Sequence, residues 1–291
     1  MDSAKIFSLC KLAVVILMMF VGVRITNAEA PADTAWWENE TLIATGYGLS
    51  SFNANNAAQA RVFARKAAIT DAYRALAEQA GEIRITANEK VTTTEVRAVI
   101  RGAKILSEEY DQYNGVYSVV MSVPIYGVSN SIAKAAFKRV DREDFPTPDV
   151  EDETVEGNYT GLIIDCGDLE LNPVLSPVVR NEEEQSIYSY RNLDYDKVIS
   201  DGMVSFVRMP EDEVTAVDEN MLLLGADGAD NLSRAGNNPL VVKVTGLDAD
   251  NTCPVLSTAD ANKILLENQA SHFLDGCSVV FMSKRIRGFL A

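Results

Sequence analysis

The segment from Asn55 to Ala80 constrains this fold most, because its composition is that of one long helix. It contains ten alanines and neither glycine nor proline. Val62, Ile69 and Leu76 recur at seven-residue spacing and predict an apolar stripe that packs on a sheet. An asparagine can cap the start, and Gly81 lies where a glycine would end the helix.

The N-terminus has the pattern of an export signal. Lys11 precedes an unbroken apolar run, Leu12–Val23, and Ala28-Glu29-Ala30 forms an A-x-A pattern. The run is too short to cross about 30 Å of hydrocarbon as a helix. We therefore predict that residues 1–30 are a signal peptide; an uncleaved membrane anchor and a buried core helix are the alternatives. Cys10 precedes the apolar run, so it is not a lipid-attachment cysteine.

A first domain is predicted over residues 31–140. The asparagine and glycine at 114–115 have the composition of a type I′ hairpin turn. The alternating, Val- and Thr-rich residues 82–100 are interpreted as one or two strands. With the long helix, the expected elements are a strand at 42–48, the hairpin 103–113 and 116–126, and a closing helix at 129–140.

Residues 141–156 are predicted to be a linker, because they hold eight acidic residues and two prolines. Such a run is usually solvated, with calcium or a basic partner as the alternative. The second domain then covers residues 157–291. Its expected elements are strands at 159–165, 203–208, 239–245 and 278–282, a hairpin from 178–180 and 186–190, and helices at 211–224 and 258–274. The strand–helix–strand order near the C-terminus favours parallel strands.

Charge narrows the classes of partner. The chain has 26 Lys and Arg against 42 Asp and Glu, a formal net charge of −16. Nucleic acid and acidic lipid are poor partners for such a surface. Basic proteins, cations and neutral surfaces remain open.

No segment carries a recognisable catalytic, metal or cofactor motif. His272 is the only histidine, and no nucleophile-elbow motif accompanies it. Gly46-Tyr47-Gly48 lacks the third glycine of a dinucleotide loop, so we interpret it as a turn that lets a strand pack under the helix. The oxygen-rich clusters 227–231 and 248–251 lack calcium-loop spacing. A carboxylate pair for hydrolysis cannot be chosen among 42 acids without geometry. The prediction is therefore a chain without catalytic residues, metal or cofactor.

Two further site predictions concern cysteines and aromatic residues. Cys253 and Cys277 flank the helix at 258–274 and form the preferred disulfide in an oxidising compartment; reduced, buried cysteines are the alternative. An aromatic contact surface is the second prediction, with core roles as the alternative, and its members are Trp36, Trp37, Tyr110, Tyr113 and Tyr117.

Residues 44–126 resemble the Lpp-twenty lipoprotein family, which includes the flagellar protein FlgP and the N-terminal domain of FlgT. The resemblance depends on ATGYG at 44–48, QARVFARKAAITDAYRALAEQ at 59–79 and VVMSVPIYG at 119–127. It implies an α+β domain with a long helix packed on an antiparallel sheet, and a role at the cell envelope. The chain lacks the lipid-bearing cysteine of the family, and it adds the second domain.

We therefore expect an α+β chain in which a second α/β domain of mixed sheet follows the first. The functional hypothesis is a non-enzymatic, exported envelope protein, periplasmic or outer-membrane-associated, whose partners are envelope or flagellar proteins or further copies of itself. It would meet membrane only indirectly and would not bind nucleic acid. A periplasmic ligand-binding module is the alternative, and a carboxylate-based hydrolase is the least favoured.

Overall fold

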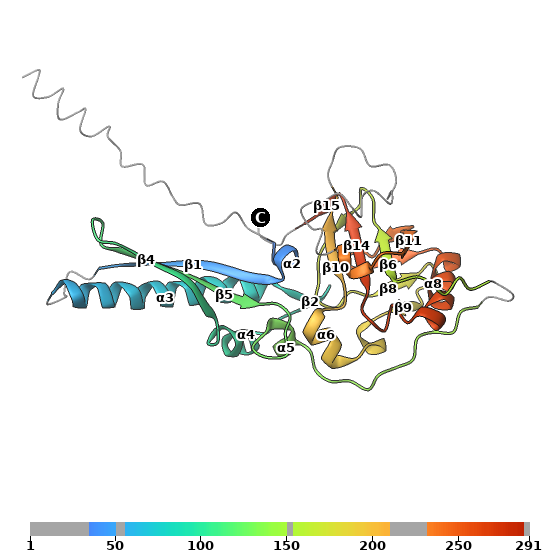
Figure 1. The fold of residues 1–291 in the computed structure, drawn as a ribbon, viewed down its shortest axis with the longest axis horizontal. Coiled ribbons are helices and arrows are strands. Elements are labelled where there is room, and N and C mark those ends of the chain that lie inside the picture. The colour runs from blue at the N-terminus through green and yellow to red at the C-terminus, as the bar shows by residue number, and fades with distance from the viewer. Residues whose placement is uncertain (1–34, 51–55, 150–153, 210–231, 288–291) are drawn as a thin grey trace, which may run out of the picture. The chain divides into compact units, whose positions relative to one another are not determined.

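The computed structural model describes residues 35–50, 56–149, 154–209 and 232–287. The chain divides into two units, Met1–Asp33 and Thr34–Ala291, and all described residues belong to the second. This unit is α+β, which confirms the predicted fold class: a long helix lies on an antiparallel sheet, and a parallel and a mixed sheet follow (Figure 1). The signal-peptide prediction and the helix expected at 211–224 lie outside the described residues.

The N-terminal part, residues 35–149, is built on the antiparallel sheet β1-β5-β4 (Figure 1). The hairpin predicted around residues 114–115 is present as β4 and β5. The elements of this part are α2 (Trp36–Asn39), β1 (Thr41–Leu49), α3 (Ala57–Glu82), β2 (Arg84–Thr86), β3 (Glu89–Lys90), α4 (Thr93–Ile100), β4 (Lys104–Asp111), β5 (Val116–Pro124) and α5 (Ile132–Ala136).

The long helix forms as predicted, but a different face of it is buried. α3 is continuous, and Asn56 caps its N-terminus through a hydrogen bond from the Gln59 amide. The expected stripe is wrong at Val62, which is 62% exposed. Gly81 lies inside the helix rather than beyond its end. The buried side chains instead follow four-residue spacing, and they are Ala64, Ala68, Ala72, Leu76 and Ala80.

Small residues on both sides explain this choice of face. A Cβ built on Gly46 would lie 2.1 Å from the Ala68 carbonyl oxygen, and one on Gly48 would lie 2.0 Å from that of Ala64. The two glycines therefore belong to the interior of β1, where they let the strand contact the helix backbone, and they are not a turn. An alanine face permits this approach, whereas a face lined by larger side chains would not.

Residues 93–100 correct another prediction, because they form helix α4 rather than a strand. Thr92 accepts from the Glu95 amide, and the Glu95 carboxylate accepts from the Thr92 amide. This capping box satisfies donors at the helix start and overrides the strand preference of the threonines. The expected strand is reduced to the two short strands β2 and β3.

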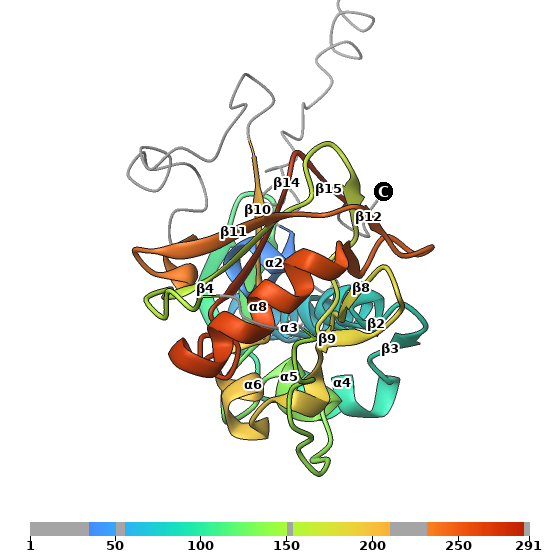
Figure 2. The same ribbon diagram turned by 90° about the vertical axis from the view of Figure 1, so that its right-hand side faces the viewer.

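The C-terminal part, residues 154–287, contains a fully parallel sheet in the order β10-β14-β6-β11 (Figure 1). Figure 2 shows three of its strands, β10, β11 and β14, from another side. Both faces of this sheet are buried, and successive side chains point to opposite faces. Leu162 and Ile164 belong to the main core, while Ile163 belongs to a second, smaller cluster. The elements of this sheet are β6 (Gly161–Asp165), β10 (Ser205–Arg208), β11 (Pro239–Lys243) and β14 (Val279–Ser283), and helix α8 (Thr258–Ser271) lies between the last two in sequence.

A mixed sheet in the order β12-β13-β8-β9 completes this part, and it includes the predicted hairpin β8–β9. Its strands are β8 (Val179–Asn181), β9 (Ser186–Tyr188), β12 (Gly246–Leu247) and β13 (Pro254–Leu256). The remaining elements are β7 (Glu170–Leu171) paired with β15 (Arg285–Ile286), helix α6 (Tyr195–Asp201), and the 3-10 turns η1 (Tyr190–Asn192) and η2 (Ser233–Ala235).

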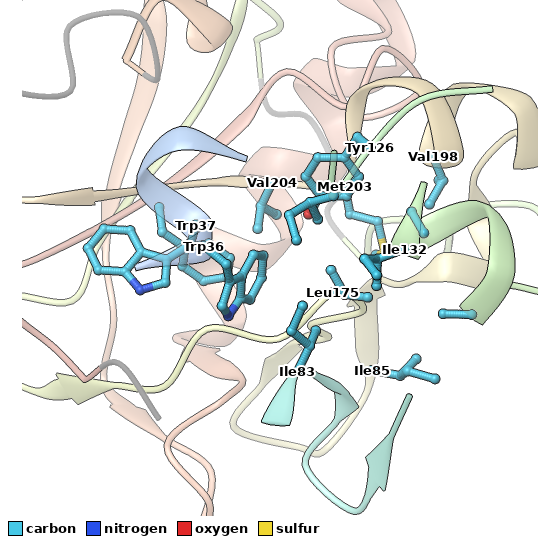
Figure 3. Close-up of a cluster of buried hydrophobic side chains, with 14 of the residues drawn as sticks. Trp36, Trp37, Ile83, Ile85, Tyr126, Ile132, Leu175, Val198, Met203 and Val204 are labelled. Carbon is cyan, nitrogen blue, oxygen red and sulfur yellow. The ribbon is translucent and has the colours of Figure 1, made fainter. Parts of the chain in front are cut away.

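One hydrophobic core is shared by the two parts. Figure 3 shows Trp36, Ile83 and Tyr126 of the N-terminal part in one cluster with Leu175 and Met203 of the C-terminal part. Backbone hydrogen bonds cross the same region, from Gly127 N to Ile199 O, from Leu175 N to Arg84 O and from Ser176 N to Ile85 O. The described residues are thus packed together rather than separated by a free linker.

The acidic segment after α5 is tied to the protein at several points. The Asp149 backbone pairs with the Asn262 side chain, and the buried Glu267 carboxylate accepts from the amides of Glu156 and Gly157 at 2.9 and 2.8 Å. Nearer α5, Arg142 donates to Asn192 O. Residues 138–149 contain no helix or strand and most of them are exposed, as expected for a solvated segment, but contacts of this kind attach them to the rest of the protein.

Candidate functional site

The three-stranded sheet presents one covered side and one accessible side. Along β1, buried residues alternate with partly or fully exposed ones, and the buried ones contact α3. On the other side Tyr47 and Leu49 are 47% and 72% exposed. At the outer strand β4, Ile105 and Leu106 are also exposed, but Ile105 pairs with buried Met121 and so belongs to the covered side, while Leu106 lies at the register shift between Ile105 and Ser107. The accessible side therefore carries apolar side chains, as protein contact surfaces do.

The two outer strands of the sheet differ in accessibility. At β1 the Tyr47 amide donates to the Asp71 carboxylate of α3 at 3.1 Å, and this bond holds the pKa of Asp71 below its usual range. At β4 the first six residues are all exposed. Apart from its pairing with β5, β4 receives no backbone hydrogen bond from another described element. β4 is therefore the open edge of the sheet, the kind of edge that accepts an added strand.

Side chains on the covered side hold β4 in place. Arg65 of α3 contacts both carboxylate oxygens of Glu108, at 2.7 and 2.5 Å, and the Tyr117 hydroxyl donates to the same carboxylate at 2.7 Å. These bonds, led by that of Arg65, lower the pKa of Glu108 to about 2. The Arg61 guanidinium lies 5.2 Å from the centre of the Tyr110 ring. These contacts on the covered side hold β4 in position, while the backbone groups on its outer edge remain accessible.

The aromatic contact surface predicted from the sequence is largely wrong. Trp36 and Trp37 are only 9% and 3% exposed, because short helix α2 turns them into the shared core. Tyr117 is buried between the sheet and α3. Tyr110 is half-buried, with its ring against the ring of Tyr117. Tyr113, in the turn of the hairpin, is 94% exposed and is the one member that fits the prediction fully.

A polar pocket of about 420 Å³ lies at the junction of the two parts, lined by Glu40, Asp201 and Arg234 among others. Burial raises the pKa of Glu40, and neighbouring Asp201 adds to this, while Arg234 at 3.5 Å opposes it. The guanidinium of Arg234 donates to Ser205 Oγ and to the backbone carbonyls of Asp201, Gly202 and Cys277. Its donors are thus used to hold the protein together, and few remain for a ligand.

Within the described ranges, Cys166, Cys253 and Cys277 are free thiols with different neighbours. Cys253 contacts the Thr252 hydroxyl at 3.3 Å, whereas Cys277 lines the Arg234 pocket. Burial raises the pKa of both thiols and raises that of Cys166 to about 12. Elevated pKa values make thiolate chemistry unfavourable. Both Cys253 and Cys277 are free, so the structure does not contain the disulfide that the sequence suggested between them.

The other sequence candidates have structural roles where the structure describes them. His272 ends α8 in a left-handed conformation and lies 3.5 Å from Asp275. Asp248 accepts from the Thr252 and Cys253 amides, which is turn chemistry. Cluster 227–231 lies outside the described residues. Within the described ranges no group of three His, Cys, Asp or Glu side chains is arranged to hold a metal ion.

Comparison with known proteins finds a similarity between the C-terminal part and one protein family. Residues 161–285 match the family model of the second domain of Treponema pallidum Tp0624. No curated protein matches the chain. The matched range spans β6 to β15, which includes the parallel sheet and the mixed sheet. No helix among the described residues is long and apolar enough to cross a bilayer.

Proposed function

We propose that this chain is an exported cell-envelope protein that works as a non-enzymatic binding component, through contacts made by its N-terminal sheet. Its partners are envelope or flagellar proteins. The observation that carries the proposal is the open edge of β4 beside a sheet surface with exposed apolar side chains. An open edge presents unpaired backbone donors and acceptors that another extended chain can bind.

Three further observations support the proposal. Residues 1–30 have the composition of a secretory signal. Residues 44–126 resemble the Lpp-twenty family of envelope proteins in their alanine and glycine pattern, and the structure gives that pattern a packing role between β1 and α3. The donors of Arg234 in the junction pocket are satisfied internally, which favours a structural role there over ligand binding.

Fractionation of the source cells tests the proposal. We expect the chain outside the cytoplasm, beginning near residue 31, and we expect it to co-purify with an envelope protein after mild cross-linking. An intact chain in the cytosol, with residues 1–30 still attached, would overturn the export claim. A processed chain that remains a monomer without any cross-linked partner would overturn the binding claim.

A further inference from the structure

The direction of each backbone group in β4 follows from the contact of Tyr47 with Asp71. Because the Tyr47 amide points away from β5, Tyr47 and its partner Ser118 form a non-hydrogen-bonded pair. The backbone groups of Ser118 then point toward β4, where they meet Glu109. Alternation along the strand directs the amides and carbonyls of Glu108 and Tyr110 outward, away from the sheet.

The side chains on this edge divide between the two sides of the sheet. Glu108 and Tyr110 lie on the covered side, where Arg65 and Arg61 contact them. Glu109 lies on the accessible side and is exposed, without an ion-pair or hydrogen-bond partner for its side chain among the described residues. An added strand would therefore meet two outward backbone groups and, between them, one unpaired carboxylate.

Charge argues against a second copy of this chain as that strand. A twofold pairing of two β4 edges must place the outward residues opposite one another. Within the regular stretch Ser107–Asp111, the registers that pair three or more residues place Glu108 opposite Glu108, Glu109 opposite Glu109, or Glu109 opposite Asp111 of the second copy. All three place acidic residues directly opposite each other, which is destabilising. The register shift before Ser107 interrupts the remaining length of the edge.

We propose that the outer edge of β4 binds an extended strand of another protein, with a basic side chain opposite Glu109. The backbone of the added strand bonds to Glu108 and Tyr110, which provides affinity without sequence preference. The Glu109 carboxylate selects a basic residue at the position directly across, and Asp111 favours a second one two residues away on the same side. This inference rests on the proposed function, because it specifies which surface binds and what chemistry it prefers.

Amide hydrogen exchange, followed by NMR on the mature protein, tests this directly. The probes are two short synthetic peptides in which valines alternate with lysines or with glutamates. In the free protein the Glu109 amide should be protected, and the Glu108 and Tyr110 amides should exchange quickly. Saturating lysine peptide should slow exchange at Glu108 and Tyr110 by at least about tenfold. The glutamate peptide should leave them unchanged.

A charge reversal and a matched control sharpen the result. Glu109→Lys should weaken lysine-peptide binding roughly tenfold and create binding of the glutamate peptide. Glu89→Lys makes the same change at an exposed position of β3 and should alter neither. Unchanged exchange with the lysine peptide, or equal protection by both peptides, would overturn the proposal. Protection without peptide that grows with protein concentration would show a second copy on the edge and would also overturn it. None of these results affects export or envelope location, which fractionation tests separately.

Discussion

Replacing Gly46 with alanine should destabilise the protein strongly, because the strand and the helix backbone are already in contact. The new Cβ would lie 2.1 Å from the Ala68 carbonyl oxygen and 2.2 Å from the Ala72 amide nitrogen. Real Cβ atoms essentially never approach other heavy atoms within 3.0 Å, so β1 must move away from α3 by close to an ångström. Overpacking of this kind costs about 1–3 kcal/mol, and the cost for this variant should be near the upper end, because three backbone atoms lie within 3.0 Å of the new Cβ.

Urea unfolding followed by circular dichroism measures this cost. With a dependence on urea of about 3 kcal/mol per molar, a loss of ~3 kcal/mol lowers the unfolding midpoint by about 1 M. Gly81→Ala, in helix α3, is the control for the same added methyl group, since nothing lies within 4 Å of its Cβ. It should stabilise the protein by about 0.5–1 kcal/mol. If Gly46→Ala changed stability no more than the control does, the close approach of β1 to α3 would be refuted.

Three further predictions follow from single contacts. Glu267→Ala leaves the amides of Glu156 and Gly157 without acceptors, so it should lower the free energy of unfolding by about 2–3 kcal/mol and speed proteolysis within residues 138–157. Equal cleavage of the variant and the wild-type protein would show that Glu267 does not anchor this segment. The lowered pKa of Glu108 means that its ionised form stabilises the fold above pH 4.5 and that this contribution is lost as pH falls toward 2; NMR titration should find the low pKa, and Arg65→Ala should return it toward 4.5. Among the cysteines within the described ranges, Cys253 should react first with a thiol reagent, because the others are buried; simultaneous reaction in the native state would contradict the packing.

The sequence predicted the backbone of the N-terminal part better than its side chains. Alanine content was enough to find α3 within two residues, because helix propensity sums over a long segment. The buried face could not be found by hydrophobicity, since Val62 is more apolar than the alanines that pack. The deciding partners were Gly46 and Gly48, whose effect depends on a strand some twenty residues away.

Local signals explain the other errors. The threonines near residue 93 favoured a strand, but the Thr92–Glu95 capping box was readable in advance and indicated a helix. Trp36 and Trp37 look exposed beside acidic neighbours, and only the packing of α2 against the C-terminal part buries them. The open edge of β4 was not predictable as such, because strand order is a property of the whole sheet.

Photo-cross-linking in the source cells, from a photoreactive side chain at position 109 of β4, tests the central claim most directly. We expect one discrete adduct with another envelope protein, and none from the same group placed at position 89 of β3. An absence of adduct at position 109, or an adduct that contains only a second copy of this chain, would contradict that claim.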